Sequence, residues 1–409
     1  MKLWFKYLAG VVFGLAIYLV APKNLLAPEG LFFSVSELAL RIGYYPIILL
    51  LAVNLPLSIL KLSEEKKLWR LTTANLGFNL VSLIIASLGG IALALVSRPE
   101  RLPLLDSVYS SIPPELPKAI HSFFPYSFGE ILTTSQEFAL PILALGGIVG
   151  LAMAHDPAAA RPLAQFLDSL SRVLYTVATF LTEILGVLLI PMAVSSLSRF
   201  SLLLEEPSIR EFLVFLSAGL VALVLLVVPF FIHLAGKRKN PFPIIYSALP
   251  SLLAALVSGS VKLALVPLVR QQRENLGIKR RFAGLTLPLG VVTSRAGSVF
   301  VASYSFVVIL YSYSPLMGSL PTLMTLLFII PLSAIIASVL PESNLMGILA
   351  IACVLFGRGL ENGYRILLPA GFILGAGASL MDILWIAVSQ TFGSGALVPN
   401  EPKSPSHFI

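Results

Sequence analysis

Residues 241–281 read PFPIIYSALPSLLAALVSGSVKLALVPLVRQQRENLGIKRR and carry the clearest fold signal in the chain. Two apolar segments, residues 241–256 and 261–269, lie on either side of the SGS sequence at 258–260, and a charged run follows them. Each apolar segment is shorter than the roughly 20 residues that a helix needs to cross a bilayer. The pattern therefore predicts a re-entrant helical hairpin, with its turn inside the membrane, rather than two spanning helices.

A second interrupted segment repeats this design nearer the C-terminus. Residues 321–338 are apolar, residues 341–344 (PESN) interrupt the pattern, and the apolar sequence then resumes up to Phe356. A long apolar segment follows each interrupted one, and we expect one continuous helix over residues 282–313 and another over 364–389. Paired short, interrupted segments in corresponding positions are typical of inverted-repeat transporters that bind their solute near the membrane midplane.

The composition agrees with a chain embedded in a membrane. Of its 409 residues, 57% are hydrophobic and 12% are charged, whereas an average soluble domain has roughly 25% charged residues. Most of the apolar surface must therefore face lipid or pack inside a helix bundle. The net charge of +8 comes from lysines and arginines that mostly border apolar segments, as topology anchors do, so no nucleic-acid partner is expected. The single cysteine, Cys353, excludes a disulfide framework and a zinc ligand set.

Six further apolar segments are long enough to span a membrane, and together with the two long ones they predict eight transmembrane helices. The six cover residues 3–20, 40–60, 74–96, 138–154, 174–197 and 212–235. The first lacks a small-residue cleavage site, so we expect an uncleaved span. With the N-terminus inside, the predicted inner side carries more than twice as many lysines and arginines as the outer side, which predicts cytoplasmic N- and C-termini.

Several segments carry a resemblance to a known family. Residues 286–298 read TLPLGVVTSRAGS, residues 139–153 read ALPILALGGIVGLAM, and residues 123–132 read FFPYSFGEIL. The first of these resembles, without a gap, the TLPLG…NMDGT stretch of the dicarboxylate/amino-acid:cation symporter family, which includes the glutamate transporters. With further matches at Pro191 and Pro267, the resemblance reaches across most of the chain.

The resemblance implies an all-α polytopic membrane protein with a glutamate-transporter-like fold of eight transmembrane helices, two re-entrant helical hairpins and inverted repeats. It also implies a homotrimer in the cell inner membrane, in which a transport domain moves against an immobile scaffold like an elevator. The implied division is scaffold helices 1 and 2 in residues 1–72, transport-domain helix 3 in 73–97, an extracellular loop in 98–136, scaffold helices 4 and 5 in 137–208, transport-domain helix 6 in 209–240, hairpin 1 in 241–278, helix 7 in 279–318, hairpin 2 in 319–360, helix 8 in 361–395 and a cytoplasmic tail in 396–409.

The chain departs from the family at positions that bind sodium and solute. The family's NMDGT reads SRAGS at residues 294–298, so serine and alanine replace the asparagine and aspartate that line the family's sodium sites. In the family's last helix, an arginine that follows an aspartate holds the side-chain carboxylate of the substrate. Alignment of Asp382 with that aspartate places Trp385 at the arginine position, and a gap-free alignment places Leu384 there. A later sodium-binding aspartate is absent near Phe392. Hard cations need several oxygen ligands, so the coupling cation stays unknown, with sodium doubtful and a proton as the alternative.

Arg295 is the most unusual residue, because a charge near the centre of a spanning helix costs at least about 2.5–3.5 kcal/mol unless it meets a partner or water. Three roles are open for it. Arg295 could form a structural ion pair with Asp382 or Glu342, hold a carboxylate of the solute bidentately, or supply a fixed positive charge where the family binds sodium. Asp382 and Glu342 are the acidic residues expected to face the site, and either could carry a coupling proton.

The two predicted hairpin turns offer helix N-termini, whose free N–H groups and dipoles favour an anion. The expected solute-binding residues are Arg295, Ser258, Gly259, Ser260, Ser343, Asn344, Asp382, Trp385 and Ser389, and the expected cation-coupling residues are Ser294, Ser298, Asp382 and Glu342. We expect Lys262 to extend to the cytoplasmic surface, with a place in the site as the alternative. Glu183, in the fifth span, is expected to make a helix-packing contact.

No nucleophile elbow, phosphate-binding glycine loop or CxxC pair occurs, so neither enzyme chemistry nor a cofactor is expected. The resemblance implies a secondary active transporter of a small carboxylate-bearing solute, such as an amino acid or a dicarboxylate. Two alternatives share the fold: a sodium-independent transporter driven by protons or by exchange, and a transport-incompetent sensor or anion channel. The expected partners are the solute, the lipid bilayer and further copies of the chain.

Overall fold

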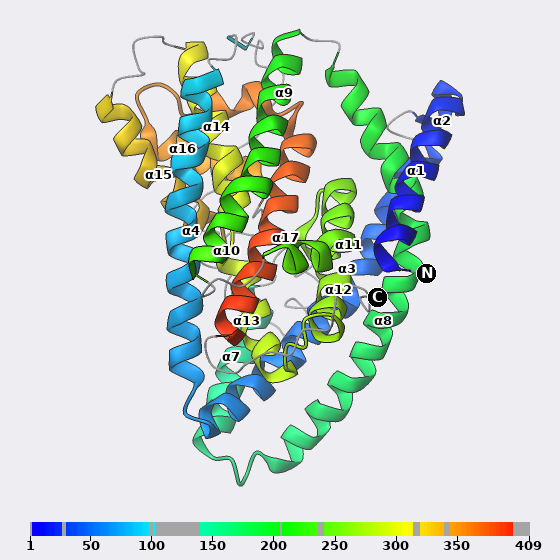
Figure 1. Ribbon diagram of the computed structural model, residues 1–409, viewed down its shortest axis with the longest axis vertical. Coiled ribbons are helices and arrows are strands. Elements are labelled where there is room, and N and C mark those ends of the chain that lie inside the picture. The colour runs from blue at the N-terminus through cyan, green and yellow to red at the C-terminus, as the bar shows by residue number, and fades with distance from the viewer. Residues whose placement is uncertain are drawn as a thin grey trace.

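The computed structural model describes residues 2–26, 30–97, 101–102, 140–204, 207–235, 241–313, 320–338 and 344–395. Helices and short turns make up these ranges, and no β-strand occurs within them. The helices form a bundle in which α8 (Arg161–Leu203) leans along one flank and α4 (Leu68–Ser97) stands along the opposite one (Figure 1).

Seven candidate membrane spans occur in the described part of the chain, each long and apolar enough to cross a bilayer. They are Leu3–Val20, Leu31–Glu64, Leu68–Ser97, Arg161–Ser201, Pro207–Phe230, Arg280–Tyr313 and Gly371–Thr391. Their outer faces expose large apolar side chains, such as Val20 at 85% and Leu226 at 68%, as surfaces that contact lipid do. The predicted fold class, an all-α polytopic membrane protein, is confirmed.

The N-terminal helices form one packed group around α8. The group contains α1 (Leu3–Val20), α2 (Lys23–Leu26), α3 (Leu31–Glu64) and α7 (Leu140–His155). Both α1 and α3 pack on α8, and α3 also packs on α7. The helices α3 and α8 run well beyond the predicted spans at 40–60 and 174–197, because the residues that flank those spans continue the helix without a break.

Ion pairs join α8 to its neighbours. Glu183 of α8 pairs with Lys6 of α1 and, at 2.6 Å, with Arg270 of α12 (Val261–Glu274). The Arg270 guanidinium also lies 3.4 Å from Glu274, whose carboxylate accepts a 3.1 Å hydrogen bond from the Tyr175 hydroxyl of α8. Glu183 therefore makes the predicted helix-packing contact, and it does so by holding three helices together.

The opposite flank contains α4 and the sixth predicted span. That span is one continuous run of α9 (Pro207–Ala222), the π-helical turn η1 (Leu223–Val227) and α10 (Val228–Ala235). The helix α4 packs on α9 and, more extensively, on α14 (Ala296–Tyr313). α4 and α9 both pack on α17 (Gly371–Gly395), and they lie beside it in Figure 1, so the central helices are covered on this side.

The first interrupted segment forms two short helices that pack against each other, α11 (Phe242–Ser258) and α12. The helix α11 ends because Gly259 adopts a left-handed backbone conformation with φ 65°, which glycine reaches without strain. Ser260 is extended, and α12 begins directly after it. The turn falls at the predicted serine and glycine residues.

The prediction of one continuous helix over residues 282–313 is wrong. The segment is divided into α13 (Arg280–Thr293) and α14, with Ser294 and Arg295 between them. Ser294 leaves the helical conformation with φ −88° and ψ 70°, and the Arg295 N–H closes a tight turn onto the Thr293 carbonyl at 3.1 Å. The break frees the first N–H groups of α14 to bond elsewhere, and one of them bonds to a side chain of α17.

The second interrupted segment forms α15 (Leu320–Ser338) and α16 (Leu345–Phe356), which pack on each other. Asn344 caps α16, since its side-chain oxygen accepts the Gly347 N–H at 2.8 Å. The helix predicted over 364–389 is present but starts later than predicted. A 3₁₀ turn, η3 (Gly363–Leu367), comes first and α17 starts at Gly371, because Pro369 has no N–H to continue a helix.

Candidate functional site

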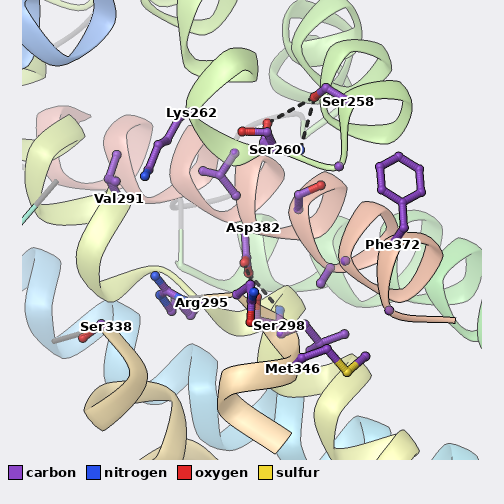
Figure 2. A pocket seen from close by; sticks show the side chains of 18 of the residues that line it. Ser258, Ser260, Lys262, Val291, Arg295, Ser298, Ser338, Met346, Phe372 and Asp382 are labelled. Atoms are coloured by element: carbon purple, nitrogen blue, oxygen red, sulfur yellow. Dashed lines mark hydrogen bonds between the residues drawn. The ribbon is translucent and has the colours of Figure 1, made fainter. Parts of the chain in front are cut away.

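A cavity of about 550 Å³ lies where the interrupted helices meet. Its walls come from the turn between α11 and α12, the break between α13 and α14, the start of α16 and the first half of α17. The lining is completed by Leu40 and Tyr44 of α3, Leu140 of α7, Arg199 of α8 and Ser338 of α15 (Leu320–Ser338). Figure 2 shows these elements converging, with side chains from each of the central ones directed toward the same space.

The turn between α11 and α12 is held rigid by short hydrogen bonds. The Ser258 hydroxyl donates to the Ala254 carbonyl at 2.6 Å. It also accepts the Ser260 N–H at 3.2 Å (Figure 2). The Tyr44 hydroxyl of α3 donates to the Ser260 Oγ at 3.0 Å. A side chain at Gly259 would meet the Phe372 ring at 3.2 Å, so the turn and the start of α17 lie in close contact.

Asp382 of α17 caps the N-terminus of α14 across the helix interface. Its Oδ1 accepts the Ser298 N–H at 3.0 Å, and its Oδ2 accepts the Ser298 hydroxyl at 2.5 Å. Asp382 and Ser298 are both buried, so these bonds replace water around the carboxylate. Gly297 allows this approach, because any side chain there would meet the Ala378 carbonyl at 2.5 Å.

Arg295 stands at the helix break beside this contact. It lines the cavity, and its positive charge interacts favourably with the carboxylate of Asp382. The charge is therefore not inside a continuous spanning helix, as the sequence suggested, but at a backbone break that opens onto a polar space. Figure 2 places Arg295 next to Asp382 and Ser298, on the side of the cavity that faces Ser338.

Two further cations line the cavity. Arg199 of α8 lies over the rings of Phe372, with 4.5 Å from guanidinium carbon to ring centroid, and of Phe33, with 5.1 Å. The Lys262 ammonium lies 6.0 Å from the ring centroid of Tyr44. Lys262 lines the cavity, as the alternative of a place in the site requires, because α12 begins there.

The structure brings most of the predicted site residues together. The predicted site residues that line the cavity are Ser258, Gly259, Ser260, Ser294, Arg295, Ser298, Asn344 and Asp382. Glu342 and Ser343 lie outside the described residues. Ser294 is buried, and Ser298 already donates its hydroxyl proton to Asp382.

Trp385 and Ser389 do not reach the cavity. Both are buried, with Trp385 against the Phe78 ring at 5.9 Å between centroids and the Ser389 hydroxyl donating to the Ile386 carbonyl at 2.9 Å. They follow Asp382 along α17, where that helix packs on α4 and α13. The cavity ends at the contact between Asp382 and α14, and Trp385 and Ser389 lie beyond that contact along α17. We therefore assign neither residue a role in solute binding.

The lining residues that were not predicted include Tyr44, Arg199 and Phe372. Arg199 lies just beyond the apolar segment 174–197, where nothing in the sequence indicates that it faces a site. No local sequence signal marks these residues, since Arg199 meets aromatic rings that lie far away along the chain. Only the tertiary packing of α3, α8 and α17 could reveal them.

The fold and the cavity define a class of protein: a polytopic helical membrane protein whose interrupted helices surround a polar, cation-lined space, as in secondary transporters. Comparison with protein-family models gives a match over residues 3–389, and the chain belongs to the sodium:dicarboxylate symporter family. None of the curated proteins matches the chain.

Membership confirms the predicted resemblance, which spans nearly the whole sequence. The chain is accordingly a multi-pass membrane transporter of the symporter type, from a family whose members carry dicarboxylates or amino acids. A transporter family also agrees with the expectation that the chain is not an enzyme.

Proposed function

We propose that the protein is a secondary active transporter that binds a small carboxylate-bearing solute in the central cavity, with Arg295 as the main partner of the carboxylate. The position of Arg295 carries the proposal: it lines the cavity at a helix break, beside Asp382. A guanidinium offers two parallel N–H donors to a carboxylate, which gives both attraction and orientation. The turn at Ser258 to Ser260 and the Asn344-capped start of α16 complete the site with polar groups.

The proposal includes weak or absent coupling to sodium. Among the described lining residues the only carboxylate is Asp382, and both of its oxygens already accept hydrogen bonds from Ser298. Ser294 and Ala296 stand where the family has oxygen-rich side chains, and Ala296 is fully buried. A hard cation would find few ligands here, so proton coupling or solute exchange is the favoured driving force.

We further propose an elevator mechanism in a homotrimer of the cell inner membrane, with cytoplasmic N- and C-termini. Family membership supports these points together with the distribution of basic residues. The helices α11, α12 and α14 around the cavity all pack on α17, and α11 also packs on α12, as parts of a body that moves as a unit would. The Glu183–Arg270 ion pair would then cross the sliding interface and break during each transport cycle, whereas the Glu183–Lys6 pair would stay within the scaffold.

Arg295→Ala is expected to weaken solute binding by at least tenfold, because removal of one partner of a buried charge pair costs about 2–5 kcal/mol. The measurement is the shift in melting temperature of the purified full-length protein over a concentration series of four-carbon carboxylic acids. Arg41→Ala is the matched control, since Arg41 pairs with Glu37 on an exposed helix surface. Equal binding by the wild type and Arg295→Ala would contradict the proposed site.

Replacement of sodium chloride by potassium chloride, at constant ionic strength, is expected to change the apparent affinity for the acid by less than about twofold. Hard cations bind through several oxygen ligands, and the cavity offers few that are not already engaged. The same melting-temperature series gives the result for each salt. A steep rise in affinity with sodium concentration would show that the chain keeps a working sodium site.

A further inference from the structure

A second group of charged side chains lies outside the cavity, where the ends of several helices meet. Asp168 of α8 lies at its centre, with its Oδ1 3.3 Å from the Arg280 guanidinium of α13 and 3.6 Å from the Lys61 ammonium of α3. Its Oδ2 lies 2.9 Å from the Arg172 guanidinium, one turn further along α8. Arg280 is also held by Asn54 of α3, whose Oδ1 accepts its Nε–H at 3.2 Å. One carboxylate therefore serves three cations.

Arg273, near the end of α12, adds a fourth cation to this group. Its guanidinium carbon lies 4.4 Å from the centroid of the Tyr175 ring of α8, which keeps it at the junction of the two helices. Arg273 and Arg172 are both close enough to Arg280 to repel its charge. Like charges that are held together are unfavourable unless an anion compensates them. The four cations, which form the basic cluster, are Lys61, Arg172, Arg273 and Arg280.

The described side chains compensate the basic cluster only in part. Among the residues that the structure describes, Asp168 is the one carboxylate that forms an ion pair with any of the four cations. Glu274 follows Arg273 in the sequence, but its carboxylate pairs with Arg270. The basic cluster is thus a positioned set of hydrogen-bond donors with a surplus of positive charge, as a binding site for an anion is.

The basic cluster lies at one end of the bundle and is accessible from outside. Figure 1 shows the start of α8 and the turn from α3 into α4 at this end. The Arg172 side chain is 76% exposed and that of Lys61 is 50% exposed, so a ligand can reach them. Phe166 and Val173 of α8 and Trp69 of α4 are exposed at the same end. Exposed tryptophan and cations at the end of apolar helices mark the level where the hydrocarbon core of a membrane meets the lipid headgroups.

We propose that the basic cluster binds the headgroup of an anionic phospholipid in the leaflet at this end of the bundle. A guanidinium offers two parallel N–H donors to phosphate oxygens, and basic pockets between membrane helices bind anionic headgroups. The exposed apolar side chains of α8 would contact the acyl chains, which a soluble phosphate lacks. The four cations come from four helices, α3, α8, α12 and α13. A lipid bound by all four would therefore hold these helices together.

The test adds one of two phospholipids to the purified full-length protein in neutral detergent. Dioleoyl phosphatidylglycerol is anionic, and dioleoyl phosphatidylcholine has the same acyl chains and no net charge. Phosphatidylglycerol is expected to raise the melting temperature in a saturable way, and by more than phosphatidylcholine does. The double variant Arg172→Gln with Arg273→Gln is expected to need at least tenfold more phosphatidylglycerol for the same shift. Arg161→Gln, which removes an exposed arginine at the start of α8, is the control and should respond as the wild type does.

Without lipid, the double variant should melt close to the wild type, because Asp168 keeps Lys61 and Arg280 as partners. Equal responses of the double variant and the wild type to phosphatidylglycerol would overturn the site. An equal loss of response in Arg161→Gln would also overturn it, since the attraction would then be diffuse. Should the double variant fail to purify as a single species, Arg172→Gln alone is expected to need at least threefold more phosphatidylglycerol, and a smaller change would overturn the site.

The choice of ligand has its own outcomes. Equal stabilisation by the two phospholipids would overturn the anionic headgroup, and equal stabilisation by inorganic phosphate would overturn the lipid as the ligand. No transported solute is present in these measurements, so their result does not depend on the proposed function.

Discussion

Gly297→Ala is expected to destabilise the protein by about 1–3 kcal/mol or more, as overpacking of a well-packed interface does. The added methyl group would meet the Ala378 carbonyl at 2.5 Å and the Asp382 N atom at 2.7 Å. Both are backbone atoms of α17, so they can move only if α14 and α17 separate. That separation would also pull Ser298 away from Asp382, and solute binding should weaken together with stability.

The measurement is the melting temperature of the purified protein, with and without a bound acid. Gly77→Ala is the matched control: it is also a glycine inside a helix, on the exposed face of α4, but a methyl group there would meet nothing within 4 Å. Exposed substitutions of this kind usually change stability by less than about 0.5 kcal/mol. A Gly297→Ala protein as stable as Gly77→Ala would show that α14 and α17 can separate at no cost in stability.

Asp382→Ala is expected to be still more damaging, with a loss of about 3–5 kcal/mol, because it leaves a charge without its counterion in a buried place. The change removes the carboxylate that faces Arg295 and the acceptor that caps α14 at Ser298. Asp382→Asn removes the charge but keeps one oxygen acceptor for the Ser298 N–H, and its amide can donate to the Ser298 hydroxyl, so a smaller loss is expected.

The pair can be tested by a double-mutant cycle. Replacement of a buried ion pair by apolar residues is often neutral, whereas removal of one partner is costly. The double variant Arg295→Met with Asp382→Asn is therefore expected to recover much of the stability that Asp382→Asn loses. The readout is the melting temperature of all four proteins without solute. Strictly additive effects would indicate that Arg295 and Asp382 act independently.

Much of the fold could be predicted from the sequence because its signals are local. The turn at Gly259 follows from short apolar segments on either side of small polar residues, and only a glycine accepts the left-handed conformation there without strain. The apolar spans likewise follow from composition and length. These features depend on residues that are neighbours in the chain.

The break before α14 could not be predicted in the same way. Apolar residues lie on both sides of Ser294 and Arg295, and neither glycine nor proline marks the point. The hydrogen bonds that stabilise the start of α14 come from Asp382, which is 84 residues away from Ser298. Arg199 was missed for the same physical reason, because Phe33 and Phe372 give it its position.

The length of α8 gives the lipid a direct influence on the site. Its 43 residues, at about 1.5 Å each, extend roughly twice the thickness of the hydrocarbon core. A helix of that length crosses obliquely, and Figure 1 shows it leaning away from the upright α4. Hydrophobic mismatch changes the tilt of such a helix. Because α8 also carries Arg199, the acyl-chain length of the surrounding lipids becomes a variable that acts on the cavity wall.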